Sequence, residues 1–173
     1  MYDELDNLKK IQPGKIKILA KTYKADYRAV SDEQVANAKL IKASGEEGSA
    51  EYIAALDKYG FNSKYEVNKV IGLSSNQGKT ANLVLRTLII GDLGFASVPY
   101  EMFDTNGMEV KEGSPCKMTF ILGTTGGASG YVPSALAVKN GGYEVYSSNF
   151  TYGTAEAVVA ELLQMLKRLK NAE

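Results

Sequence analysis

One acidic residue and two tyrosines in the second half of the chain stand where the side chains of an active site are often found. Glu101 follows an apolar run, at the point where a strand is predicted to give way to a helix. Tyr131 and Tyr143 are separated by a segment that ends in two glycines, Gly141 and Gly142. A carboxylate and two phenols offer oxygen atoms that can bind a cation or hydrogen-bond a substrate. The chain contains no histidine, so any catalysis by this chain alone must proceed without the usual general base.

Length and composition narrow the class of protein. We predict a single domain over residues 1–173, because a chain of this length removes roughly two thirds of its unfolded surface from water. The sequence has 20 basic residues (Lys and Arg) and 20 acidic residues (Asp and Glu), which predicts no nucleic-acid partner. Cys116 is the single cysteine, so an intrachain disulfide is excluded. No apolar run approaches the ~20 residues that span a bilayer, which predicts no transmembrane segment.

The beginning of the chain is predicted to form a short polar helix over residues 3–12 and then a strand. Ile16 and Ile18 alternate with Lys17 and Lys21, the period of two that is typical of a half-buried strand. This pattern predicts an isoleucine face against the core and a lysine face in solvent.

Two helices are predicted next. Ser31 and Gln34 have the spacing of a capping box, which predicts a helix over Asp32–Ala43. A second helix is expected to end at Gly60, since glycine readily adopts the left-handed conformation that closes a helix.

The segment from Gly72 to Thr80 contains a Gly-Lys-Thr sequence that invites comparison with a phosphate-binding loop. That motif requires four residues between its glycines, whereas five residues separate Gly72 from Gly78. The run that follows is apolar and β-branched, which favours a strand over the helix of a phosphate-binding loop. A polar surface loop is therefore the preferred interpretation.

The sheet is predicted from three apolar runs. Leu83–Ile90 and Gly94–Val98 form an antiparallel hairpin around a glycine-bearing turn, and Met118–Leu122 forms a third strand. A final helix begins near Thr154 and carries an apolar stripe that is expected to cover the core. We predict an α+β fold, a mixed β-sheet with a hairpin and helices packed on one side.

Local signals also give a prediction for the surroundings of the acidic residue. Pro99 is expected to stop the second strand of the hairpin and to open a helix over residues 100–105, with Glu101 in its first turn. There a carboxylate is favoured by the helix dipole alone, so a purely structural role for it is open. Asn106–Gly107 is predicted to be a turn. The glycine-rich loop Gly123–Gly130 suits either close approach to a ligand or a mobile connection.

Several segments in order resemble one known family. From about Asp32 onward, and most closely from Leu88 to the end, the sequence resembles the C-terminal portion of the catalytic domain of the neutral/alkaline ceramidase family. The segments that carry the resemblance are Ile90-Gly91-Asp92-Leu93, Val98-Pro99-Tyr100-Glu101, Thr119-Phe120-Ile121-Leu122-Gly123, Gly130-Tyr131-Val132-Pro133 and Gly141-Gly142-Tyr143-Glu144.

The resemblance implies a zinc site that this chain only partly supplies. The family holds its catalytic zinc with two histidines from the first half of the domain and with a glutamate and a tyrosine from the second half. Carried onto the matching positions, Glu101 and Tyr131 are the expected metal ligands. Tyr143 is the expected catalytic tyrosine that hydrogen-bonds the transition state. Zinc lowers the pKa of a bound water to about 7, which makes hydroxide available for attack on an amide carbonyl.

The resemblance also implies partners that lie outside this chain. We expect the sequence to be the C-terminal half of a zinc-dependent amidase that hydrolyses an N-acyl, sphingolipid-type amide. Its partner is then the missing N-terminal half, and the amide lipid is the substrate of the intact protein. The chain alone is expected to be inactive and not to retain zinc. The family suggests a secreted, periplasmic or membrane-associated parent protein.

Two residues beside the expected glutamate ligand depart from the family pattern. The family usually has glycine and proline where this sequence has Tyr100 and Met102. A tyrosine there either narrows the substrate pocket or points away from it. The alternative function is a non-catalytic module of the same fold that binds a ligand or partner through the loop Gly123–Gly130.

Overall fold

The structure is a computed structural model that describes residues 7–8 and 14–172. A four-stranded sheet in the order β1-β2-β3-β5 forms its centre. The strands of this sheet are β1 (Ile16–Asp26), β2 (Thr80–Ile90), β3 (Leu93–Ser97) and β5 (Met118–Leu122). A separate two-stranded pair consists of β4 (Glu101–Met102) and β6 (Tyr131–Val132). The helices are α1 (Asp32–Ala43), α2 (Ala50–Tyr59), α3 (Lys64–Ser74), α4 (Asp104–Gly113), α5 (Ala135–Asn140), α6 (Tyr143–Tyr146) and α7 (Thr154–Asn171).

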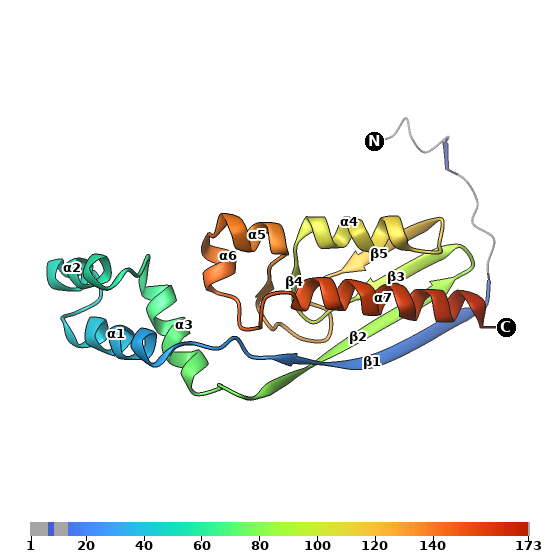
Figure 1. Cartoon of the computed structure of the whole chain (residues 1–173). Coiled ribbons are helices and arrows are strands. Elements are labelled where there is room, and N and C mark those ends of the chain that lie inside the picture. Colours follow the sequence, from blue (N-terminus) through green and yellow to red (C-terminus); the bar gives the residue numbers. More distant parts are fainter. Residues whose placement is uncertain (1–6, 9–13, 173) are drawn as a thin grey trace.

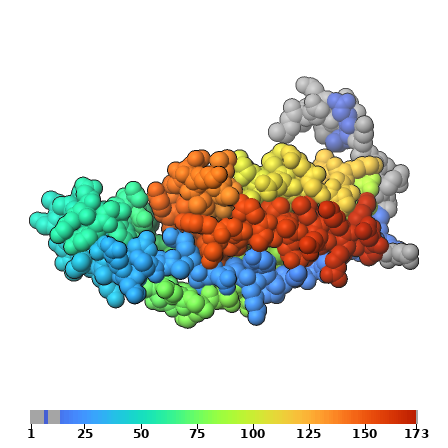
Figure 2. Space-filling view, viewed as in Figure 1, coloured from blue at the N-terminus to red at the C-terminus, as the bar shows by residue number. Residues whose placement is uncertain are grey.

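The main sheet is mixed, because β1, β2 and β3 run antiparallel whereas β5 is parallel to β3. Helices α4 and α7 lie along one face of this sheet (Figure 1). The space-filling view shows the two helices side by side over that face, with α1, α2 and α3 projecting beyond the end of the sheet (Figure 2). The predicted α+β fold, with a hairpin and with helices on one side, is confirmed.

Helix α7 carries the apolar stripe that was expected of the final helix. Leu162 and Leu166 are fully buried against Leu85 and Ile89 of β2. Each fully buried aliphatic side chain stabilises the fold by roughly 1.5–3 kcal/mol relative to its exposed state. Gly153 is the N-cap of this helix. No helix within the described residues is both long enough and apolar enough to cross a membrane.

Helices α1, α2 and α3 form an extension between β1 and β2 with an apolar cluster of its own. Tyr27, just after β1, packs against this cluster and against the core of the sheet. The predicted capping box is present, since the Ser31 hydroxyl accepts from the Gln34 amide at 3.1 Å and the Gln34 side chain accepts from the Ser31 amide at 3.0 Å. Gly60 ends α2 in the left-handed conformation, with φ at 70°. Helix α3 was not predicted from the sequence. Gly72, which was assigned to a polar surface loop, lies within this helix.

Two local predictions near the sheet are wrong, and a third is not tested. Glu101 lies in strand β4 and not in a helix, and the helix begins only at Asp104. Asn106 and Gly107 are buried inside α4 and form no turn. The predicted helix over residues 3–12 lies almost entirely outside the described residues.

The faces of β1 are the reverse of the prediction. Ile18 is 65% exposed on the face of the sheet opposite to α4 and α7. Lys17 and Lys21 point to the side of α7, where the Lys17 ammonium donates to the Ala172 carbonyl and Lys21 pairs with Glu161 at 2.7 Å. The alternating pattern identified the strand correctly, but it could not say which face the helices cover.

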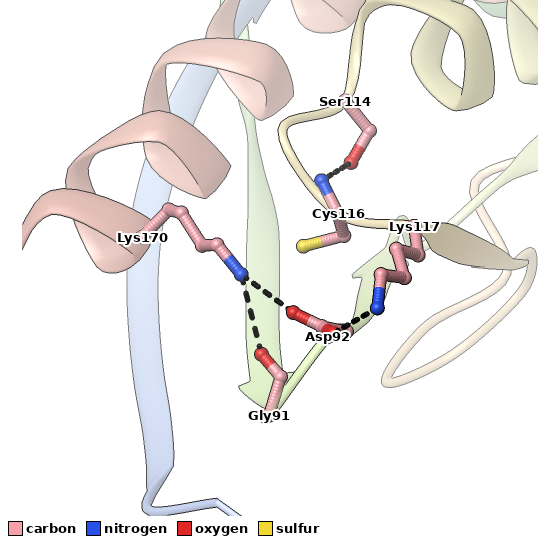
Figure 3. A network of polar contacts seen from close by, with 6 residues as sticks. All are labelled: Gly91, Asp92, Ser114, Cys116, Lys117 and Lys170. Atoms are coloured by element: carbon pink, nitrogen blue, oxygen red, sulfur yellow. Dashed lines mark hydrogen bonds and ion pairs between the residues drawn. The ribbon is translucent and has the colours of Figure 1, made fainter. Parts of the chain in front are cut away.

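A network of charges fixes the turn between β2 and β3 to its neighbours (Figure 3). The Asp92 carboxylate pairs with Lys117 at 2.8 Å, just before β5, and with Lys170 of α7 at 3.1 Å. Hydrogen bonds from these lysines hold the pKa of Asp92 below its ordinary value. The network lies at the start of β3, whereas Glu101 lies beyond the end of that strand.

Candidate functional site

Strands β4 and β6 bring Glu101 and Tyr131 together. The two residues are direct partners in a parallel pair, and the Glu101 amide donates to the Gly130 carbonyl at 2.9 Å. Paired residues project their side chains to the same face of a sheet, so the carboxylate and the phenol are neighbours. The short pair therefore places the two expected metal ligands side by side, from segments far apart in the sequence.

Tyr100 and Glu101 are neighbours with opposite surroundings. The Tyr100 side chain is fully buried in the core, and burial raises the pKa of its phenol. Glu101, the first residue of β4, is exposed. The sequence left two possibilities for Tyr100, a side chain that narrows the substrate pocket or one that points away from it. The second is observed.

Hydrogen bonds hold the loop 123–130 against residues 98–100, which connect β3 to β4. Thr124 donates its amide to the Tyr100 carbonyl at 3.0 Å, and Ser129 donates to the Pro99 carbonyl at 2.8 Å. A Cβ on Gly127 would lie 2.9 Å from the Cβ of Pro99, so glycine permits this close approach. Several backbone donors of the loop are used within the fold, which argues against a freely mobile connection.

The Tyr131 phenol lies within hydrogen-bonding reach of the Glu101 carboxylate, which raises the pKa of Tyr131. The negative charge of the carboxylate adds to this shift, followed by smaller contributions from burial, Glu144 and Tyr143. Tyr131 therefore holds its proton more firmly than a free tyrosine. A cation bound between the two oxygens would act in the opposite direction, since it favours the phenolate.

Tyr143 joins this pair from the first position of α6. Its ring lies edge to face with that of Tyr131, at a centroid distance of 6.1 Å, and it makes a similar contact with Tyr65 at 5.7 Å. Gly142 precedes it with φ at 111°, a conformation that side chains rarely adopt, so the turn requires glycine. The Tyr143 side chain is 52% exposed. The residues predicted to form the site thus lie in one cluster, built from β4, β6 and α6.

A groove of about 410 Å³ opens beside Tyr143, between α3 and α6. Polar side chains line much of it. The Lys69 ammonium of α3 donates to the side-chain Oδ1 of Asn149 at 2.7 Å, and the side-chain Nδ2 of Asn149 donates to the Ser129 carbonyl at 3.1 Å. Burial, with a smaller contribution from Arg28, lowers the pKa of Lys69. Sequence reasoning assigned neither Lys69 nor Asn149 to a site, because α3 was not predicted and Asn149 stood out only as part of the glycosylation sequon Asn149-Phe150-Thr151.

The donor set fits part of a zinc site. Carboxylate and phenol oxygens are suitable zinc ligands, and Glu101 and Tyr131 offer both at neighbouring positions. Catalytic zinc sites usually have three protein ligands and one open position. Within the described residues there is no group of three histidine, cysteine, aspartate or glutamate side chains that could hold a metal ion.

Known proteins give no guide to this cluster. Protein-family models, curated proteins and solved structures contain no match to the chain. The function is therefore argued from the side chains themselves.

Proposed function

We propose that this chain supplies half of the zinc site of an amidase and that a histidine-bearing polypeptide supplies the other half. The observation that carries the proposal is the pairing of Glu101 with Tyr131 across β4 and β6. Two oxygen donors from distant segments meet at the surface, next to a further phenol and a groove. This arrangement suits a ligand set that is completed from outside.

Each of the three side chains has a distinct role in this proposal. Glu101 and Tyr131 would hold the metal through their carboxylate and phenol oxygens, and the Tyr131 phenol would lose its proton to solvent. When bound, zinc would polarise the amide carbonyl and acidify a water molecule. The Tyr143 hydroxyl donates a hydrogen bond to the amide oxygen that becomes negative in the transition state. One such donor contributes about 3 kcal/mol to the rate in comparable hydrolases.

The substrate we propose is an N-acyl amide with a polar head group. The groove beside Tyr143 has a volume of about 410 Å³, within the usual range for small-molecule sites. Its lining by Lys69 and Asn149 favours hydroxyl or carbonyl groups over an aliphatic chain. The alternative, ligand binding through the loop 123–130, has less support because amides of that loop already donate within the fold.

Cobalt(II) with free imidazole tests the half-site directly. Cobalt(II) replaces zinc in many sites, and it absorbs visible light strongly when it has four ligands. Imidazole can take the place of the missing histidines. We expect the strong absorption only when the chain, cobalt and imidazole are all present, and we expect Glu101→Gln and Tyr131→Phe each to abolish it.

Two matched substitutions serve as controls. Glu112→Gln changes an exposed acid on α4, and Tyr152→Phe removes the hydroxyl of a tyrosine that is 41% exposed. Both variants should keep the absorption. Absorption that survives in Glu101→Gln and Tyr131→Phe would refute the assigned ligands. Tight zinc binding and amide turnover by the chain without imidazole would refute the idea of a half-site.

A further inference from the structure

One face of the main sheet carries rows of apolar side chains that no described helix covers, and the loop 123–130 reaches only the end of this face near Arg86 and Ser97. The register aligns three rows across the strands. They are Ile16-Ile90-Leu93-Met118, Ile18-Leu88-Phe95-Phe120 and Ala20-Arg86-Ser97-Leu122. The rings of Phe95 and Phe120 are stacked, with centroids 5.2 Å apart. We call this surface the open face.

The two edge strands carry the most exposed apolar side chains of the open face, whereas those of β2 and β3 are half-buried. Ile16 is 64% exposed, Met118 is 55% exposed and Phe120 is 42% exposed. A shallow trough of about 430 Å³ runs along the face from Ile18 to Leu122. The exposed apolar surface is on the order of 600 Å², the upper limit of the largest patch on a typical monomer.

We propose that two copies of this chain pack their open faces against each other. Sheets stack face to face about 10 Å apart, with the side chains of the two inner faces interdigitated. A face of this size on each copy would bury on the order of 1,200 Å² in total, which reaches the lower limit of specific interfaces. A twofold axis closes such a contact, so the assembly is a dimer.

Charge also favours a second copy as the occupant. Arg86 is the charged side chain in the three rows, and it lies in the outermost of them. The acidic and basic residues of the chain balance at 20 each, so two copies are not driven apart by net charge. Two identical chains present the same three rows, so each copy offers the other an apolar surface of the same size. The proposal goes beyond the zinc half-site and uses neither Glu101 nor Tyr131.

Sedimentation and light scattering over a dilution series test the dimer. We expect the wild-type chain to be a dimer that dissociates on dilution. Phe120→Glu places a charge in the middle row of the interface, on the edge strand β5, and should weaken the dimer by on the order of 100-fold or more. Ile53→Glu is the matched control, because Ile53 is 52% exposed on α2 and far from the open face in the fold. It should leave the dimer intact.

Circular dichroism shows whether each variant is folded, and Ile18→Glu repeats the test from the other side of the face. A wild-type chain that stays monomeric at all concentrations would overturn the proposal and would mean that a different polypeptide covers the face. A folded Phe120→Glu or Ile18→Glu variant that dimerises like the wild type would also overturn it. Assemblies larger than a dimer would do so as well, because face-to-face packing closes after two copies.

Discussion

The two faces of the main sheet have similar residue types and opposite surroundings. On the face under α4 and α7, Leu83 and Leu85 are at most 1% exposed. On the open face, Ile16 and Ile18 are 64% and 65% exposed. Strand β2 contributes apolar side chains to both faces, as strands between two packed layers do. Residue type alone therefore says that both faces suit burial, and only the position of the helices tells which one this chain covers itself.

The largest effect is expected where the covered face meets α7. Leu162→Ala removes a fully buried side chain from the core and leaves a cavity. Such a change costs about 2–5 kcal/mol of the free energy of unfolding. Urea denaturation of the wild type and the variant measures the difference. A loss below 1 kcal/mol would mean that α7 does not pack on the sheet as described.

A substitution on the same face should act in the opposite direction. Thr87 is 1% exposed, and its buried hydroxyl has no hydrogen-bond partner among the described residues. Thr87→Val keeps the shape and removes the unpaired hydroxyl, so it should stabilise the protein by about 1 kcal/mol. Thermal unfolding measures this gain. Destabilisation would indicate that the hydroxyl does have a partner.

Shortening a side chain on the open face should change the free energy of unfolding of the monomer only slightly. Ile18→Ala shortens a side chain that is already 65% exposed, so its effect on unfolding of the monomer should stay within about 0.5 kcal/mol. The measurement is urea denaturation at the lowest workable protein concentration. A loss as large as that of Leu162→Ala would erase the distinction between the faces.

The smallest effect is expected at Asp92, whose ion pairs anchor α7 and β5 at the exposed end of the sheet. The folded-state pKa of this carboxyl lies below its ordinary value of 3.8, because Lys117 and Lys170 stabilise the charged form. The contribution to stability is therefore complete above the unfolded pKa and is lost as the pH falls through the folded pKa. Asp92→Asn should be slightly less stable than the wild type at neutral pH, and the gap should close in acid. A gap that is independent of pH would contradict the ion pairs.

Elements with strong local signals could be predicted from the sequence. The capping box at Ser31 set the start of α1, Gly60 set the end of α2, and Met118–Leu122 formed the predicted strand. These features depend on residues only a few positions apart, which is the range over which sequence patterns are informative.

Elements formed by distant partners could not be predicted. Glu101 had the signals of a helix start, but its amide pairs with Gly130 and its side chain lies beside Tyr131. That pairing overrides the local preference for a helix. The burial of Tyr100 and the groove between α3 and α6 likewise depend on packing between segments far apart. Residue type and position made Glu101 and the two tyrosines candidates but left a purely structural role for Glu101 open, and the expected role of each came only from the resemblance to the ceramidase family.

The central claim is that Glu101 and Tyr131 together bind a metal that histidines from elsewhere complete. Carbon-13 labelling of the tyrosine ring carbon that bears the hydroxyl lets NMR follow the Tyr131 phenol through a pH titration. We expect its pKa, raised by Glu101 in the free chain, to fall when zinc and imidazole are both present and to stay unchanged with either alone. In Glu101→Gln the initial pKa should be lower and the response to zinc and imidazole should vanish. A pKa of Tyr131 that does not change with zinc and imidazole, or that changes equally in Glu101→Gln, would contradict the claim.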